Sequence, residues 1–334
     1  MNKSCLNKNI KIFLNWVVGP LLFIWLTWSI IIQVRHQPNL NESLRYLQES
    51  AFGLKSRKFW IVIAMMFLNW GLEARKWQVL MNSLEKISFW RAFKAVLSGV
   101  SFALNTPNRI GEYGGRILYV SEGKRIQSAA LTIAGSFSQL IITLFMGGLG
   151  VLFSKKGLIE NGNPGESLSL ILNVLMWAVF IAAIFCLLIY FRLAWIVRSF
   201  EKVPLVSRFV KQVTILETIS VTILLRVLSL SFVRYVVFVV QYILLFDVMH
   251  VYMGWWQAFW LIGVLYLVLA VVPTIALLEL GIRGKASILL FKLYSSNSVG
   301  IYATATGIWL VNLVVPALAG SLLIIGVKIF NEKR

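Results

Sequence analysis

Charged residues, and acidic residues above all, are scarce in this chain. Only 13% of its 334 residues are charged, against about 25% in soluble proteins. Asp247 is the only aspartate, which disfavours DxD-type metal-dependent glycosyltransferases, phosphoryl-transfer aspartates and aspartate-bearing triads. The two cysteines, Cys5 and Cys186, are too far apart to indicate a disulfide framework or a metal cluster. His36 and His250 are lone residues, so we expect no metal centre and no cofactor.

Apolar residues, by contrast, make up 59% of the chain. A helix needs about 20 mostly apolar residues to cross a bilayer. Hydropathy predicts six full spans, at residues 12–33, 59–80, 127–153, 168–191, 218–246 and 300–327. We therefore expect an all-α, polytopic membrane protein, with residues 1–334 forming a single membrane domain and no separate soluble domain.

Two further apolar stretches are interrupted. Residues 92–106 are too few for an ordinary span before Thr106 and Pro107, and residues 255–294 are broken at Pro273. Both are predicted to be broken or re-entrant elements. If one enters from the cytoplasm and the other from outside, they form an inverted pseudo-repeat, an arrangement common in alternating-access transporters.

The basic residues predict the orientation. Lysine and arginine number 32 against 13 acidic residues, a net charge of +19. With both termini cytoplasmic, 20 of the 32 basic residues fall in cytoplasmic segments, 7 in outer segments and 5 within the membrane. The positive-inside rule then favours a bacterial inner-membrane protein with cytoplasmic N- and C-termini. Most of the excess charge lies beside anionic lipid, so no nucleic-acid partner is needed.

The first polar motif is TPNRIGEYGGR, at residues 106–116. Thr106 as N-cap and Pro107 as the first helical residue predict a helix start. Arg109, Glu112 and Arg116 would then share one face, where Glu112 can pair with either arginine. Small residues on the other side would let a neighbouring backbone approach closely: Gly111, Gly114 and Gly115. The alternative is a polar loop at the cytoplasmic surface.

The second motif is PTIALLELGIRGK, at residues 273–285. Glu279 and Arg283 are four residues apart and therefore stack on one helical face. Pro273, Gly281 and Gly284 permit a tight or unwound backbone. The motif has the same ingredients as the first one, but apolar residues flank it on both sides.

Further charges lie inside or beside the predicted spans. Arg234 falls near the middle of span 218–246, whereas Arg226 could snorkel to the cytoplasmic surface. Glu73 and Arg75 close the second span and are expected to be interfacial anchors or secondary members of a site.

Nine charges are expected in or against the membrane core: Glu73, Arg109, Glu112, Arg116, Arg226, Arg234, Glu279, Arg283 and Lys285. Unpaired, they would cost on the order of 25 kcal/mol, more than a typical stability of about 5–15 kcal/mol. They must therefore pair or line a wet cavity. Six are positive and three negative, so an anion would complete the site. Phospholipid and isoprenoid-phosphate headgroups are membrane-borne anions, and arginine suits phosphate.

Three strings carry a family resemblance: TPNRIGEY at 106–113, EARKW at 73–77 and P-x5-ELGIRG at 273–284. They resemble the lysylphosphatidylglycerol synthase transmembrane-domain family, which includes the flippase-like domain of multiple peptide resistance factor. The resemblance covers nearly the whole chain and implies translocation of a lipid between leaflets. In the best-known member an aminoacylated phosphatidylglycerol is moved, and a following soluble domain makes that lipid. Here the sequence stops soon after Val327, so no aminoacyl-transfer domain is expected.

The sequence therefore predicts a lipid flippase for an anionic or aminoacylated phospholipid or a lipid-linked phosphate. Glu112 and Glu279 would hold the arginines while the site is empty. The residues expected to contact the headgroup phosphate are Arg109, Arg116, Arg234 and Arg283. Two alternatives stay open: a transferase acting on polyprenyl-phosphate lipid, and a non-transporting subunit of an envelope-assembly complex. The oligomeric state, a homo-oligomer included, also stays open.

Overall fold

The computed structural model describes residues 8–35, 45, 48–49, 53, 56–106, 109–161, 166–192, 214–217, 219–272 and 276–324. Within these ranges the chain forms helices and no strand. The helices are α1 (Lys8–Arg35), α3 (Ser56–Met81), α4 (Phe89–Leu104), α5 (Gly111–Ile117), α6 (Arg125–Asn161), α7 (Glu166–Phe191), α10 (Val221–Val248), α11 (Trp255–Val271), α12 (Ala276–Phe291), α13 (Ser298–Trp309) and α14 (Val315–Ile324). Shorter elements are the 3-10 turns η2 (Glu122–Lys124) and η3 (Thr214–Glu217) and the π-helical turn η4 (Leu310–Val314), which joins α13 to α14.

Four of the described helices are long and apolar enough to cross a membrane. They comprise residues 122–160, 168–191, 221–248 and 298–324, and they correspond to four of the predicted spans. The other two predicted spans are occupied by α1 and α3, and α3 carries charged residues at its start and in its last third. The prediction of an all-α polytopic membrane protein is confirmed.

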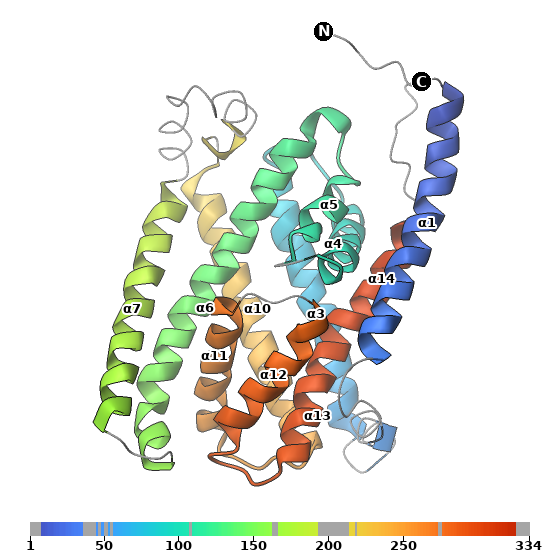
Figure 1. Cartoon of the computed structure of the whole chain (residues 1–334). Coiled ribbons are helices and arrows are strands. Elements are labelled where there is room, and N and C mark those ends of the chain that lie inside the picture. Colours follow the sequence, from blue (N-terminus) through green and yellow to red (C-terminus); the bar gives the residue numbers. More distant parts are fainter. Residues whose placement is uncertain are drawn as a thin grey trace.

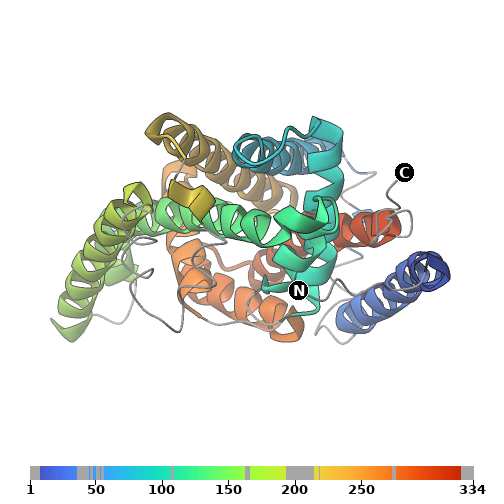
Figure 2. The ribbon, with the colours of Figure 1, turned by 90° about the horizontal axis from the view of Figure 1, so that it is seen from above.

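The long helices stand side by side, with the broken elements between them (Figures 1 and 2). At one edge α7 packs on α6, and at the other α1 packs on α14. The outer side of α7 carries large apolar side chains that are exposed, among them Leu170, Trp177 and Phe185. Such a surface suits contact with lipid hydrocarbon and would be unfavourable in water.

The two interrupted stretches form re-entrant helix pairs. The first pair is α4 and α5, which connects the upper end of α3 to the upper end of α6 in Figure 1. The second pair is α11 and α12, which connects the lower end of α10 to the lower end of α13. Each pair therefore returns to the end from which it came, and the two pairs enter from opposite ends, as an inverted pseudo-repeat requires.

The start of α5 differs from its prediction. The helix begins at Gly111 and not at Thr106 and Pro107, because Arg109 has a φ of 60°, in the left-handed region that a right-handed helix cannot contain. The hydroxyl of Thr106 still caps the helix, because its Oγ1 accepts a hydrogen bond of 2.7 Å from the backbone N–H of Gly111. Pro107 lies outside the described residues.

Glycines let α4 and α5 pack backbone to backbone. A Cβ atom at Gly115 would lie 2.6 Å from the Cα of Gly99, and one at Gly111 would overlap the carbonyl oxygen of Phe102. A Cβ atom at Gly114 would meet nothing within 4 Å. Two of the three glycines in the first motif thus lie at the close contact, and Gly114 faces open space.

This contrast gives a matched pair of variants. We expect Gly115→Ala to lower the free energy of unfolding by about 1–3 kcal/mol, because the α4 backbone cannot yield. Gly114→Ala should leave the stability unchanged or raise it, because alanine is the better helix former. Unfolding by a denaturing detergent measures both, and equal effects of the two variants would contradict the close packing.

Candidate functional site

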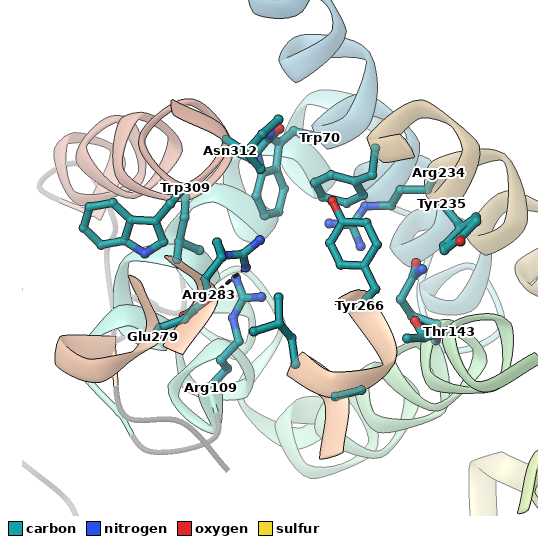
Figure 3. Close-up of a pocket in the computed structure, with 16 residues that line it drawn as sticks. Trp70, Arg109, Thr143, Arg234, Tyr235, Tyr266, Glu279, Arg283, Trp309 and Asn312 are labelled. Carbon is teal, nitrogen blue, oxygen red and sulfur yellow. Dashed lines mark hydrogen bonds and ion pairs between the residues drawn. The ribbon is translucent and has the colours of Figure 1, made fainter. Parts of the chain in front are cut away.

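A central cavity lies where the two re-entrant pairs approach each other. It has a volume of about 260 Å³ and takes its lining from α3, α6, α10, both pairs and the α13–α14 span (Figure 3). The labelled lining residues in Figure 3 are Trp70, Arg109, Thr143, Arg234, Tyr235, Tyr266, Glu279, Arg283, Trp309 and Asn312. Polar side chains from segments far apart in the sequence therefore meet at one place inside the bundle.

Glu73 of α3 is the centre of the charged network beside this cavity. Its Oε1 accepts a hydrogen bond of 2.8 Å from Nη2 of Arg116, and its Oε2 accepts one of 2.8 Å from Nη1 of Arg234. Lys76 Nζ lies 2.7 Å from Oε2. Glu73 is only 4% exposed, and Lys76 and Arg116 are each 2% exposed. One buried carboxylate therefore holds three cations.

A second carboxylate completes this network. Glu112 forms an ion pair with Arg116, one turn further along α5. The predicted pairing of Glu112 with Arg116 is thus present, and it ties α5 to α3 through Glu73. Two carboxylates face three cations here, so the network carries one positive charge in excess.

Arg234 is held from two further directions. Its Nε donates a hydrogen bond of 2.7 Å to Oδ1 of Asn69, and its Cζ lies 5.2 Å from the ring centroids of Trp70 and of Phe238. Both ring distances are within the range of cation–π attraction. These contacts hold the Arg234 side chain in place in the cavity lining, with its guanidinium group bound to Glu73.

Three amide side chains continue the hydrogen bonding from Arg234. Nδ2 of Asn69 donates to Oδ1 of Asn312 over 3.3 Å, and Nδ2 of Asn312 donates to Oε1 of Gln241 over 2.9 Å. Asn312 lies in the π-helical turn η4, and such turns occur frequently at functional sites. These hydrogen bonds connect α3, α10 and the α13–α14 span beside the cavity.

The second motif lies at the beginning of α12. Nη2 of Arg283 donates a hydrogen bond of 3.1 Å to Oε1 of Glu279, as their spacing predicts, and both residues line the cavity. A Cβ atom at Gly284 would overlap the ring of Tyr302, whereas one at Gly281 would meet nothing within 4 Å. Pro273 precedes the described part of this motif, which starts at residue 276.

Arg109 has the least restrained charge in the cavity. It lies in the turn between α4 and α5, is exposed, and points into the same space as Arg283 (Figure 3). No described acidic side chain pairs with it, because Glu112 pairs with Arg116 instead. Its left-handed backbone conformation costs about 1–2 kcal/mol, and strain of this kind clusters at functional sites.

The backbone strain at Arg109 can be measured directly. We expect Arg109→Gly to be more stable than Arg109→Ala by about 1 kcal/mol, because only glycine adopts a φ of 60° without strain. Both variants lose the guanidinium, so the comparison isolates the backbone. Unfolding by denaturing detergent tests this, and a more stable alanine variant would contradict the left-handed conformation.

The structure does not bring all predicted residues to the cavity. Arg75 is exposed and donates a hydrogen bond of 2.7 Å to Oε1 of Gln78, and the side chains of Arg226 and Lys285 are exposed outside the cavity lining. The predicted residues that line the cavity or join its ion-pair network are Glu73, Arg109, Glu112, Arg116, Arg234, Glu279 and Arg283. In the part of the chain that is described, no group of three or more His, Cys, Asp and Glu residues could hold a metal ion.

Four members of the charged network and the amide chain lay outside the predicted site: Asn69, Lys76, Gln241 and Asn312. Asn69, Glu73 and Lys76 follow one another at intervals of four and three residues, which places them on one face of a helix. That spacing could have identified the α3 face. Asn312 gives a weaker signal, a single amide within a long apolar run.

Comparison with known families agrees with this architecture. We found no significant match to the chain among curated proteins or among solved structures. A family model described as "Lysylphosphatidylglycerol synthase TM region" matches residues 12–320, a range that contains both motifs, the cavity and the charged network. This chain is a multi-pass membrane protein that belongs to the lysylphosphatidylglycerol synthase TM region family.

Proposed function

We propose that this domain moves an anionic lipid between the two leaflets, with the headgroup phosphate bound in the central cavity. The observation that carries the proposal is the cavity itself, lined by three arginines from three different elements. Arg109, Arg234 and Arg283 line one cavity of a membrane bundle, and charged side chains within such bundles are expensive and mark substrate pathways. The family's membrane domain fits a lipid-related role.

The two re-entrant pairs supply a means of alternating exposure. They enter from opposite ends (Figure 1), and both contribute residues to the cavity lining, so rocking of one pair against the other would open the cavity to one side at a time. A bound phosphate would compete with Glu279 for Arg283 and would complete the coordination of Arg109. The carboxylates thus keep the arginines in place between transport cycles.

We further propose that the upper end in Figure 1 is cytoplasmic, in a bacterial inner membrane. Arg91 and Lys94 of α4 lie at that end as exposed basic residues, and Lys124 of η2 is a half-buried one. The positive-inside rule assigns such residues to the cytoplasm. Labelling of single cysteines at positions 94 and 156 in intact cells would give opposite accessibilities if this orientation holds.

Leaflet exchange in proteoliposomes tests the function. A fluorescent anionic lipid on the inner leaflet is protected from an impermeant quencher until it is moved outward. The reconstituted protein should raise the exchange rate above that of protein-free vesicles. Equal rates would contradict the proposal, and product formation from polyprenyl phosphate and a nucleotide sugar would support a transferase instead.

A further inference from the structure

The charges and shape of the cavity identify the headgroup more closely; this step rests on the proposed function. We propose that the transported lipid ends in a terminal phosphate, either a phosphate monoester or a diphosphate, and that its headgroup carries no amine.

The first argument is the charge balance. The described charged groups that line the cavity, or reach it through ion pairs, comprise five cations and three carboxylates: Lys76, Arg109, Arg116, Arg234 and Arg283 against Glu73, Glu112 and Glu279. Residues 107–108 and 273–275, which lie outside the described residues, contain no ionisable side chain in the sequence. The site therefore has an excess of two positive charges. A terminal phosphate supplies about two negative charges near neutral pH, since its second pKa is about 6, whereas a phosphodiester supplies one.

The second argument is the arrangement of the donors. Arg109 comes from the α4–α5 turn, Arg234 from α10 and Arg283 from α12, so their guanidinium groups approach from different directions (Figure 3). A guanidinium binds phosphate oxygens through a planar fork of N–H donors. A phosphodiester has two free oxygens, but a terminal phosphate has three. Three arginines around one cavity therefore match a terminal phosphate.

The third argument concerns the amine. Glu279 is the one carboxylate among the described lining residues, and its Oε1 already forms an ion pair of 3.1 Å with Nη2 of Arg283. Arg234 already lies over the rings of Trp70 and Phe238, so those aromatic faces are not available to a headgroup ammonium. An aminoacylated headgroup would add positive charge to a cavity that is already positive.

The size and edge of the cavity fit a compact headgroup on a hydrocarbon chain. Its volume of about 260 Å³ is below the roughly 300–1,000 Å³ of pockets for drug-sized ligands. Leu269 and Ala270 are apolar lining residues of the cavity, and the next residue, Val271, is exposed. A lipid chain could therefore leave the cavity past these apolar residues and remain in the hydrocarbon of the bilayer.

Matched lipids test the headgroup class. Proteoliposomes of phosphatidylcholine would contain a trace of fluorescent phosphatidic acid, phosphatidylglycerol, lysyl-phosphatidylglycerol or an isoprenyl diphosphate. We expect phosphatidic acid and the isoprenyl diphosphate to exchange at least tenfold faster than phosphatidylglycerol. Arg109→Ala should remove this preference, and Arg226→Ala, which changes an exposed arginine outside the cavity, should retain it.

A binding measurement separates this inference from transport. The purified protein in neutral detergent would be heated with each lipid and, in a separate arm, with inorganic diphosphate alone. Stabilisation by phosphatidic acid but not by phosphatidylglycerol supports the terminal phosphate even if no lipid is exchanged, in which case only the proposed transport fails. Equal or greater stabilisation or exchange by phosphatidylglycerol or the lysyl lipid would overturn the inference. If inorganic diphosphate stabilises the protein and phosphatidic acid does not, the ligand of the cavity is a free phosphate compound and not a lipid.

Discussion

Glu73→Gln is expected to lower the free energy of unfolding by about 3–5 kcal/mol, the usual cost of breaking a buried ion pair by removing one partner. Glutamine keeps the shape of the side chain and removes its charge. Arg116, Arg234 and Lys76 would then lose the carboxylate that they share at 2.7–2.8 Å. Glu112 pairs only with Arg116 and cannot compensate for all three cations. Unfolding by denaturing detergent or by heat measures the loss.

Glu160→Gln is the matched control for this variant. Glu160 pairs with Lys156 on α6, but both side chains are more than half exposed, and surface pairs contribute about 0–1 kcal/mol. The control should therefore be nearly as stable as the wild type. Similar stabilities of Glu73→Gln and Glu160→Gln would show that Glu73 does not hold the buried cations together.

Arg109→Ala is expected to reduce lipid exchange at least tenfold while changing the stability little. A tenfold effect corresponds to about 1.4 kcal/mol, and a lost hydrogen bond to a charged group costs about 1.5–3 kcal/mol. The stability should be retained because the side chain is exposed and has no acidic partner among the described residues. Exchange of labelled phosphatidic acid, measured on folded protein, gives the rate.

Arg226→Ala and Arg109→Lys complete this test. Arg226 is exposed on α10 outside the cavity, so its removal should leave the exchange rate within a factor of two of the wild type. Lysine at position 109 keeps the charge but lacks the forked donors, and it should give an intermediate rate. If Arg109→Ala exchanged lipid as fast as Arg226→Ala, the phosphate would not bind at Arg109.

The sequence predicted the parts of the site that depend on local spacing. Glu112 and Arg116, and likewise Glu279 and Arg283, are four residues apart, and each pair forms an ion pair because one helical turn brings the two side chains together. The interrupted apolar stretches also predicted the two re-entrant elements, since residues 92–106 are too few for a full span and residues 255–294 are broken at Pro273.

The position of Glu73 could not be derived in this way. It follows the apolar part of the second span and is close to Arg75, so its favoured interpretation was an anchor at the membrane surface. In the structure α4 packs against α3, Arg116 of α5 forms an ion pair with Glu73, and Glu73 is buried. Burial of this side chain therefore depends on a tertiary contact with a segment some 40 residues later in the sequence, which hydropathy along α3 does not record.

The backbone conformation of Arg109 is the second feature that the sequence does not predict. Arg109 was expected within a helix that begins at Pro107, where it would pair with Glu112. Its φ of 60° is incompatible with that helix, and its guanidinium group points into the cavity instead. Arginine has no intrinsic preference for this conformation, so the residue type at position 109 does not predict it.

A structure of the protein purified with its native lipid gives the most direct test of the proposed headgroup site. We predict density for a phosphate within hydrogen-bonding distance of Arg109, Arg234 and Arg283, with the lipid chain leaving past Ala270, and mass spectrometry of the same sample should identify a lipid with a terminal phosphate. Lipid headgroups bound elsewhere on the bundle, with the arginine cavity containing only water, would contradict it.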